Sequence, residues 1–379
     1  MKKVIEASEA IALGTKLCRP GVVPMYPITP QTHIVERLAD YIFDGELDSE
    51  IIHAESEHSA ISAALGAQAT GARTFTATAS QGLALMHEML FVVSGMRLPV
   101  VMAVANRALS APISIWNDHQ DSISARDSGW IQFYVESAQE ALDTVIMAFK
   151  IAENEKVRLP VMVCLDGFTL SHVWEEVDIP EQGKVDKFLP KYNPKYYLDP
   201  KKPITMGPIA YPNSFMEMKK MQQDSMISAI DAVKKVSKEF NAVFGRSYGD
   251  GMIENYKMAD AEYAVICAGT ICGTSRVVVD EMQEKGKKVG LIKLKSFRPF
   301  PKKELITACK KLKGIAVLDR NISVGQEGGI YTELREVLAE QNIIVNGFIA
   351  GLGGRDVKPD HIIKALNSLN KKRETEWLM

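Results

Sequence analysis

Apolar residues in the first half of the chain fall into short runs that predict strands, separated by stretches with helical spacing. The runs predict strands at 21–26, 50–54, 73–77, 98–105 and 159–165. The spacing of apolar residues predicts helices at 29–43, 57–71, 81–94 and 138–152. Strands that alternate with helices form a parallel sheet covered on both faces, so this part of the chain predicts an α/β domain.

A second block of the same kind begins near residue 260. It predicts strands at 263–268, 288–294, 314–318 and 343–350, and helices at 274–285, 302–312, 329–341 and 359–369. We therefore expect an α/β protein with two parallel-sheet domains, 1–180 and 260–379. Residues 181–259 begin with a stretch rich in Lys, Pro and Tyr, and they show helical periodicity only at 224–240. They predict a connector that wraps over a surface and has no chemistry of its own.

Composition narrows the classes of function. A chain of 379 residues is too long for one ordinary domain, and its net charge of −2 offers no basic surface for nucleic acid or an anionic membrane. The longest apolar run, 98–105, is too short to cross a bilayer, and the N-terminus lacks the pattern of a signal peptide. We therefore expect a cytoplasmic protein that binds neither nucleic acid nor a membrane.

The five cysteines, Cys18, Cys164, Cys267, Cys272 and Cys309, are scattered, and no CxxC occurs. Cys164 and Cys267 lie in apolar runs, where a thiol is usually a small core residue. This pattern suits a reducing compartment. It predicts no disulfide framework, no metal site and no iron–sulfur cluster held by this chain.

Ligands of open parallel sheets bind beyond the carboxyl ends of the strands. Polar residues follow the predicted strands there, among them Thr29, Glu57 and Arg107. A carboxylate, a guanidinium and hydroxyl groups at one edge suit an anionic substrate and an ionisable cofactor. His119, in the polar run 117–121, is a further candidate.

Each of these residues also has a purely structural explanation. Thr29 before Pro30 has the pattern of a helix N-cap with proline at the first helical position. Glu57 fits an acid favoured by the dipole at a helix N-terminus, and Arg107 fits a structural ion-pair partner. His119 fits a histidine in a solvated loop, and its polar surroundings favour that interpretation.

Three glycine-rich segments carry weaker signals. Gly249-Asp-Gly251 has the start of a diphosphate- and magnesium-binding motif, but that motif needs an Asn further along, where 276–279 reads Arg-Val-Val-Val. We interpret it as a turn. Gly269-Thr-Ile-Cys-Gly273 lacks the full G-x-G-x-x-G spacing, which disfavours a nicotinamide dehydrogenase. Gly351-Leu-Gly-Gly354 is also interpreted as a turn.

Nine segments form an ordered set that runs almost from end to end. They are Tyr26-Pro-Ile-Thr-Pro30, Glu55-Ser-Glu-His-Ser59, Thr76-Ala-Thr-Ala-Ser-Gln-Gly-Leu83, Ala105-Asn-Arg-Ala-Leu-Ser110, Asn117-Asp-His-Gln-Asp121, Pro203-Ile-Thr-Met-Gly207, Gly245-Arg-Ser-Tyr-Gly249, Phe297-Arg-Pro-Phe300 and Gly351-Leu-Gly-Gly-Arg-Asp356. Any one segment is a weak signal, but the set resembles the alpha subunit of pyruvate:ferredoxin oxidoreductase, within the 2-oxoacid:ferredoxin oxidoreductase family.

The resemblance implies a fold and a division of labour between subunits. The first domain would be the pyrimidine-binding half of a thiamine-diphosphate enzyme, and the last a transketolase C-terminal-like domain. A beta subunit would carry the diphosphate and Mg²⁺ site and a [4Fe–4S] cluster, and gamma and delta subunits would complete the heterotetramer. The implied reaction converts pyruvate and coenzyme A to acetyl-CoA and CO₂, with electrons passed to ferredoxin.

By the same resemblance, Glu57 is the carboxylate that hydrogen-bonds the pyrimidine ring of thiamine diphosphate. Tyr26, Pro27 and Ile28 belong to the cofactor site. A charge-assisted bond of this kind is strong in a buried site. Glu55 lies two residues away, and an extended chain would point both acids the same way, but the family pattern selects Glu57.

Arg107 can hold a substrate carboxylate through its planar guanidinium, and the resemblance adds Thr29 to the same carboxylate. The 117–121 segment is expected to close over the site, with His119 as a proton relay. Two alternatives stay open. One is the same chemistry on 2-oxoglutarate or a branched 2-oxoacid, because one methylene changes binding by only about 1–3 kcal/mol. The other is a non-catalytic scaffold subunit.

Overall fold

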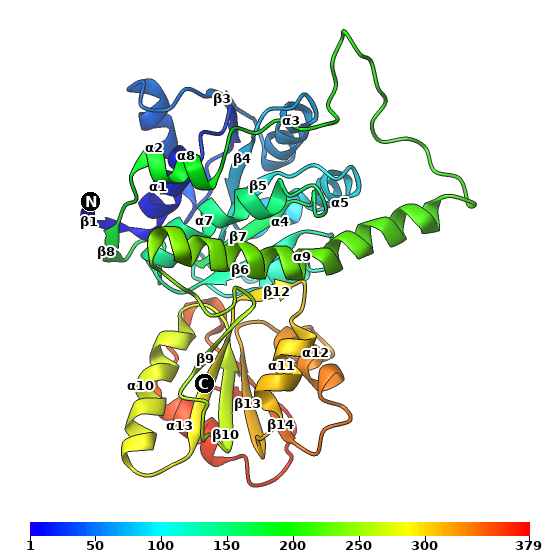
Figure 1. The fold of residues 1–379 in the computed structure, drawn as a ribbon. Coiled ribbons are helices and arrows are strands. Elements are labelled where there is room, and N and C mark those ends of the chain that lie inside the picture. Colours follow the sequence, from blue (N-terminus) through cyan, green and yellow to red (C-terminus); the bar gives the residue numbers. More distant parts are fainter.

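The computed structural model describes residues 1–379 and contains two large β-sheets, each covered by helices, one above the other in Figure 1. The first part of the chain contains β1 (Lys2–Glu6), α1 (Ala7–Leu17), β2 (Val22–Met25), α2 (Thr32–Phe43), β3 (Glu50–His53), α3 (Glu57–Ala69), β4 (Phe75–Thr78), α4 (Ser80–Leu85), α5 (His87–Gly95), β5 (Val101–Asn106), α6 (Gln120–Ser124), β6 (Ile131–Val135), α7 (Ala138–Ala152), β7 (Val161–Asp166), β8 (Trp174–Asp178) and α8 (Gln182–Phe188).

The second part of the chain begins with a long helix and forms the lower sheet in Figure 1. It contains α9 (Phe215–Phe244), β9 (Ile253–Tyr256), β10 (Tyr263–Cys267), α10 (Ile271–Glu284), β11 (Val289–Leu294), β12 (Ser296–Arg298), α11 (Lys302–Cys309), β13 (Gly314–Asp319), α12 (Gly329–Val337), β14 (Ile344–Ala350), the 3₁₀ turn η1 (Leu352–Gly354), α13 (Pro359–Asn367) and β15 (Glu376–Leu378). No helix of the chain, α9 included, has an apolar stretch that would span a bilayer.

The strands of the first sheet run in the order β12-β6-β7-β5-β4. β4, β5 and β7 are parallel neighbours, as the alternating pattern predicts, and β6 is parallel to β7. The parallel pair β2–β3 continues this arrangement through a bridge between Val22 and Thr74, next to β4. The pattern does not predict β6, where Gln132 interrupts the apolar run, nor the mostly exposed antiparallel pair β1–β8.

The second sheet has six strands in the order β15-β14-β13-β10-β11-β9. The four central strands are parallel and correspond to the four predicted strands. β9 pairs antiparallel with β11, and β15 pairs parallel with β14, so the sheet extends beyond the prediction at both edges. These edge strands are short and carry few buried residues, which is why hydrophobic periodicity does not reveal them.

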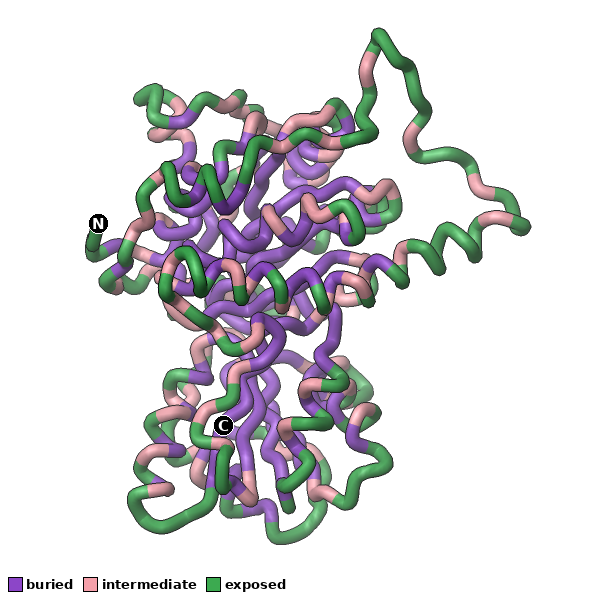
Figure 2. Tube along the Cα trace, in the orientation of Figure 1, coloured by how far each residue is buried: buried purple, intermediate pink, exposed green.

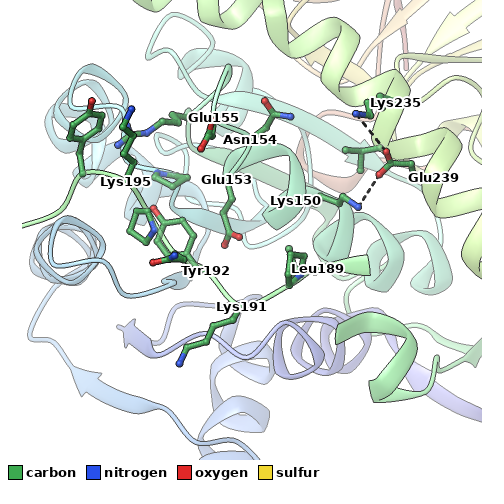
Figure 3. Close-up of a pocket in the computed structure, with 17 residues that line it drawn as sticks. Lys150, Glu153, Asn154, Glu155, Leu189, Lys191, Tyr192, Lys195, Lys235 and Glu239 are labelled. Atoms are coloured by element: carbon green, nitrogen blue, oxygen red, sulfur yellow. Dashed lines mark ion pairs between the residues drawn. The ribbon is translucent and has the colours of Figure 1, made fainter. Parts of the chain in front are cut away.

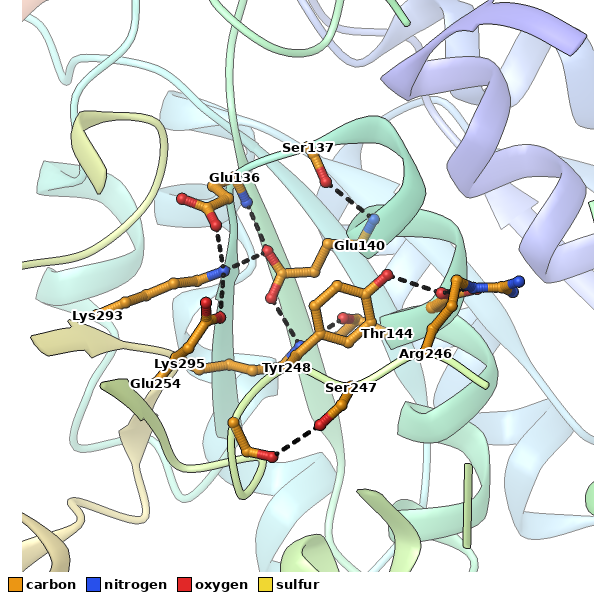
Figure 4. Close-up of polar contacts among 12 residues, drawn as sticks. Glu136, Ser137, Glu140, Thr144, Arg246, Ser247, Tyr248, Glu254, Lys293 and Lys295 are labelled. Carbon is orange, nitrogen blue, oxygen red and sulfur yellow. Dashed lines mark hydrogen bonds and ion pairs between the residues drawn. The ribbon is translucent and has the colours of Figure 1, made fainter. Parts of the chain in front are cut away.

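Non-covalent contacts, in addition to the chain itself, hold the two sheets together. β12, which follows β11 in the second part, pairs with β6 of the first sheet. Beside this junction, the buried carboxylate of Glu140 on α7 accepts hydrogen bonds from Lys293 at 2.6 Å and from Lys295 at 2.8 Å (Figure 4). The second domain is therefore held against the first by a shared strand and by buried ion pairs.

The connector follows the predicted path over a surface only in part. Phe188 and Leu189 are buried in the core of the first domain and Leu198 is hydrogen-bonded to Ala69, whereas the chain that follows is largely exposed, although Met206 packs against the core (Figures 1 and 2). The connector helix, α9, starts at Phe215 rather than at 224. Its first ten residues contribute nothing to the core, because their apolar side chains are exposed, and the first buried residue of α9 is Ser225.

A cavity of 580 Å³ lies between α7, α9 and the 189–196 segment (Figure 3). Lysine, arginine and tyrosine side chains of that segment and its neighbours line it. Lys150 and Lys235 both pair with Glu239 at its edge. None of the residues that line this cavity is a predicted site residue, so the candidate chemistry lies elsewhere.

Candidate functional site

Glu57 is the first residue of α3 and is buried, with 7% of its surface exposed. Ser56 caps the helix, because its hydroxyl accepts the Ser59 backbone N–H at 3.2 Å. The expected position of Glu57 at a helix N-terminus is confirmed. A negative charge is stabilised there by the helix dipole, which offsets part of the cost of burying it.

Glu55 and Glu57 do not point the same way, because the helix begins between them. The Glu55 carboxylate accepts a hydrogen bond from the Ser59 hydroxyl, and Glu55 is exposed. Glu57 takes part in no ion pair or hydrogen bond of its side chain within the chain, although it is the buried member of the two. The expectation from an extended backbone is therefore wrong, and the two acids have different environments.

The surroundings of Glu57 fit a ring that brings hydrogen-bonding atoms. Gly82 of α4 lies so close that an added Cβ would stand 2.6 Å from Glu57 Oε1 and 2.5 Å from Thr78 Oγ1. The Thr78 hydroxyl is buried and has no hydrogen-bond partner. A buried carboxylate and an unpaired hydroxyl beside a glycine suit the nitrogen atoms of an aminopyrimidine, so the residues present fit thiamine diphosphate.

Arg107 follows β5 and is held at two points. Its Nε donates to the Ser114 carbonyl and its Nη1 donates to the Thr29 carbonyl, each at 3.0 Å. Nη2 forms no hydrogen bond within the chain, and the residue is 8% exposed. The structure therefore brings Arg107 and Thr29 together, and the guanidinium keeps a donor that an anionic group can use.

Thr29 is not a helix cap. α2 begins at Thr32, and Gln31 holds the preceding turn by accepting the Ile28 N–H at 3.2 Å and donating to the Ala77 carbonyl at 2.8 Å. The N-cap interpretation is wrong because this buried glutamine, rather than a threonine hydroxyl, orders the turn. Thr29 is exposed at the edge of the sheet.

Tyr26, Pro27 and Ile28 lie in the same turn, directly after β2. Pro27 is exposed, whereas Tyr26 and Ile28 are half-buried, with Ile28 packed against the core of the first domain. The turn is at the carboxyl end of its strand, as predicted for the cofactor site. No hydrogen bond joins these three residues to Glu57, and their part in cofactor binding stays a prediction.

His119 is buried, not solvated. Its Nε2 lies 2.6 Å from Asp166 Oδ1, and its backbone N–H donates to the Arg320 carbonyl at 2.8 Å. Burial alone would raise the pKa of Asp166, but Arg320 and His119 hold it below its usual range. The solvated-loop interpretation is wrong because the second domain covers the loop. The role of His119 as a proton relay stays a prediction.

Sequence reasoning assigned no role to Asp121, which the structure places at the centre of this edge. Its buried carboxylate accepts backbone N–H groups of Ser80 and Arg107, at 2.9 and 3.0 Å. Asn106 also donates to it, at 2.7 Å. The available signal was the pair of polar residues Asn106 and Asp121 beside a fully apolar strand, since polar groups in such places are buried only when they are paired.

The glycine-rich and cysteine-containing segments have structural roles. Asp250 between Gly249 and Gly251 accepts the backbone N–H groups of two following residues, so this segment is the predicted turn. The 351–354 segment forms the short η1 turn after β14. All five cysteines are unpaired and buried, as expected of small core residues.

Comparison with known proteins agrees with this arrangement. Residues 14–239 match the family model described as pyruvate flavodoxin/ferredoxin oxidoreductase, thiamine diphosphate-binding. Residues 261–362 match pyruvate:ferredoxin oxidoreductase core domain II. The fold and the matched domain define an α/β protein in which a thiamine-diphosphate-binding domain precedes a second parallel-sheet domain.

The chain belongs to the pyruvate:ferredoxin oxidoreductase family, which confirms the resemblance carried by the nine segments. It is 53% identical to pyruvate synthase subunit PorA of Methanocaldococcus jannaschii, over 99% of this chain and 97% of that one. It is 49% identical to the subunit of the same name in Methanothermobacter thermautotrophicus, over the same shares. Ketoisovalerate oxidoreductase subunit VorA of Pyrococcus horikoshii is 45% identical, over 100% and 98%.

Two solved structures share the fold. One is 2-oxoglutarate:ferredoxin oxidoreductase from Magnetococcus marinus, with a TM-score of 0.76 and 19% identity. The match covers 98% of this chain, which spans 65% of that longer chain. The other is a split-gene transketolase, an inactive β4 tetramer, with a TM-score of 0.58, 13% identity and 97% and 98% of the two chains covered. Both agree with the predicted succession of two α/β domains.

Proposed function

We propose that this chain is the thiamine-diphosphate-site subunit of an oxidoreductase that converts pyruvate and coenzyme A to acetyl-CoA and CO₂ and passes the electrons to ferredoxin. The observation that carries the proposal is the buried Glu57 carboxylate, without an ion-pair partner, in a domain of the thiamine-diphosphate-binding family. The relatives named for pyruvate, 49% and 53% identical over nearly their full length, support pyruvate as the substrate.

Glu57 would hold the aminopyrimidine ring through a charge-assisted hydrogen bond to a ring nitrogen. The unpaired Thr78 hydroxyl lies beside the same carboxylate, and Gly82 leaves room for both of these groups. Tyr26, Pro27 and Ile28 would border the cofactor from the turn after β2. Bound thiamine diphosphate would supply the carbanion-stabilising chemistry that decarboxylation of a 2-oxoacid requires.

Arg107 would bind the carboxylate of the substrate with its free Nη2 and hold it in one orientation for reaction. Thr29, which is exposed beside the guanidinium, would contribute its hydroxyl to the same carboxylate. His119 would relay protons through Nδ1, because Nε2 is in contact with Asp166.

Partner subunits would complete the site. We assign the diphosphate and Mg²⁺ site and a [4Fe–4S] cluster to a beta subunit, and further clusters to partners that include gamma and delta subunits. The apolar side chains of Leu85, Ile113 and Trp116 are exposed on segments next to this edge, at 51%, 77% and 52%. Such exposure is typical of a surface that contacts another protein. The five unpaired cysteines suit the cytoplasm as the location.

Substitution of Glu57 in the assembled complex tests the proposal. Glu57→Gln should lower coenzyme A-dependent pyruvate oxidation, followed by reduction of a dye, by about 100-fold or more, because an amide is a much weaker partner for the ring nitrogen. Glu55→Gln is the matched control, because Glu55 is two residues away and exposed, and it should keep activity within about threefold. If the Glu57→Gln complex keeps activity within a few-fold of wild type, the proposed hydrogen bond from Glu57 to the aminopyrimidine ring is excluded as a requirement for catalysis.

A substrate panel tests the choice of 2-oxoacid. The ratio kcat/KM should be higher for pyruvate than for 2-oxoglutarate and ketoisovalerate, by about tenfold or more. A higher value for either of the larger acids would replace pyruvate as the substrate while leaving the cofactor role of Glu57 intact.

A further inference from the structure

Asp121 lies just inside α6, at the carboxyl edge of the first sheet, and is 1% exposed. Each of its carboxylate oxygens accepts two hydrogen bonds. Oδ1 accepts from Asn106 Nδ2 and from the Ser122 backbone N–H, both at 2.7 Å. Oδ2 accepts from the backbone N–H groups of Ser80 at 2.9 Å and Arg107 at 3.0 Å.

Three of these donors come from the ends of two neighbouring strands, and the fourth, Ser122, is the next residue in α6. Ser80 opens α4 after β4, with a left-handed φ of 48°, and Asn106 and Arg107 stand at the end of β5. The Ser80 hydroxyl also donates to the Ala108 carbonyl at 2.6 Å. One buried carboxylate therefore joins two neighbouring strand ends, and the backbone of Arg107 is one of the groups that it holds.

The second domain holds the segment that carries Asp121. Each of the four residues before Asp121 is hydrogen-bonded to the second domain, through its backbone or its side chain. The bonds are Gly354 N to Asn117 O at 2.6 Å, Gly353 N to Asp118 Oδ2 at 3.1 Å, His119 N to Arg320 O at 2.8 Å and Ile322 N to Gln120 Oε1 at 3.0 Å. The segment therefore lies between the second domain and the end of β5.

We propose that Asp121 is a positioning residue that holds Arg107 for the substrate carboxylate, and that the second domain keeps Asp121 in place through residues 117–120. The proposal rests on the proposed function, in which Arg107 binds the 2-oxoacid. It gives the second domain a part in substrate binding, although none of the residues predicted to touch the substrate belongs to it.

Four hydrogen-bond donors point at the side chain of residue 121, two at each oxygen, so both of its terminal atoms must be acceptors, as they are in a carboxylate. In an amide, one oxygen becomes an NH₂ group, which donates and cannot accept. In the variant Asp121→Asn, either orientation of the amide would therefore turn a donor toward two other donors, either those of Ser80 and Arg107 or those of Asn106 and Ser122. The backbone at Arg107 would shift away from the misplaced group, and the guanidinium with it.

The first test compares Asp121→Asn with Asp143→Asn in the assembled complex. Asp143 is a matched control because it is a fully buried aspartate, bonded to Arg246 at 2.6 Å and to Tyr248 at 2.7 Å, in α7 away from the candidate site. Asp121→Asn should raise the KM for pyruvate about tenfold or more, with kcat within about threefold. Asp143→Asn should lower the melting temperature and leave KM unchanged.

A double-mutant cycle separates positioning from general disruption. Arg107→Gln alone should raise KM, and adding Asp121→Asn should raise it no further, because the second residue acts through the first. Effects that add in full, or an unchanged KM in a folded Asp121→Asn complex, would overturn the positioning role. An unchanged KM in Arg107→Gln alone would instead remove Arg107 from the proposed function.

Gln120→Ala tests the part played by the second domain, and it carries the test if Asp121→Asn does not assemble. This half-buried side chain accepts the Ile322 N–H, and its loss leaves Asp121 itself unchanged. We expect KM to rise about two- to fivefold with kcat retained, and we expect this effect to disappear in the Arg107→Gln background. An unchanged KM in Gln120→Ala would overturn the role of the second domain.

Discussion

The Glu57 carboxylate lies directly against the backbone of Gly82, and only a residue without a side chain leaves it that space. A Cβ at position 82 would be 2.6 Å from Glu57 Oε1 and 2.5 Å from Thr78 Oγ1, closer than non-bonded atoms approach. Gly82 is in the first turns of α4, where glycine has no conformational advantage over alanine. Its presence is therefore explained by the neighbouring carboxylate and hydroxyl.

Gly82→Ala should reduce both activity and stability. The new methyl group would overlap the Thr78 hydroxyl and the Glu57 side chain, so we expect kcat to fall by about tenfold or more and the free energy of unfolding to fall by about 1–3 kcal/mol. Enzyme assays and thermal melts measure the two effects. Gly66→Ala in α3 is the control, because nothing lies within 4 Å of a Cβ there, and it should be neutral or slightly stabilising. Equal activity losses in the two variants would contradict the prediction.

Arg107→Lys should weaken substrate binding. A lysine cannot reach the Ser114 and Thr29 carbonyls and keep a free donor in the same plane, so we expect the KM for pyruvate to rise by about tenfold. The control is Arg97→Lys, since the Arg97 guanidinium also bonds two backbone carbonyls, those of Val157 and Arg158. That control should lose stability without a change in KM. A normal KM in Arg107→Lys would argue against a guanidinium-specific contact.

Glu140 should make the stability of the chain depend on acid pH. Burial opposes its charge, but Lys293 and Lys295 lower the pKa of Glu140 to about 2, from an ordinary value near 4.5 (Figure 4). A lowered pKa stabilises the folded state above pH 4.5, and this contribution of about 3 kcal/mol is lost as pH falls toward 2. The difference in unfolding free energy between wild type and Glu140→Gln should shrink over that range. Denaturant titrations at several pH values measure it, and a constant difference would contradict the prediction.

Gly249→Ala should destabilise the junction of the two domains. Gly249 has a φ of 62°, and a Cβ there would stand 2.0 Å from the Ile253 carbonyl oxygen. The backbone strain of an alanine at this φ and the overlap of its Cβ with the carbonyl oxygen should together lower the free energy of unfolding by about 2 kcal/mol or more. Gly286 has a φ of 75° and nothing lies within 4 Å of a Cβ there, so Gly286→Ala should introduce backbone strain without overlap. It should lower the free energy of unfolding by about 1 kcal/mol. Chemical denaturation measures the loss of stability in the two variants. Similar losses would contradict the prediction, because they would show that the structure adjusts to remove the overlap at position 249.

The local pattern of apolar and polar residues was sufficient to predict most of the central strands and helices. The buried strands β5, β7 and β13 are apolar up to their last residue and β10 is apolar throughout, and α7 starts and ends at the predicted residues, because burial requires continuous or periodic apolar positions. The buried strand β6 was missed because Gln132 interrupts its apolar run, and elements with little buried surface were also missed, such as β9, β15 and the exposed start of α9. Hydrophobic periodicity reflects burial, so it cannot predict a helix or strand that is not buried.

By itself the sequence determined the two α/β blocks, the family, and the positions of Glu57, Thr29 and Arg107 after their strands, because strand ends and motifs are properties of the local chain. Only the tertiary structure decided that His119 is buried against Asp166, that Asp121 joins Ser80 to Arg107, and that β12 enters the first sheet. Asp166 and Arg320 are 154 residues apart, and their pairing depends on how the domains pack. Contacts between distant segments arise from the packing of whole domains, which no local pattern specifies.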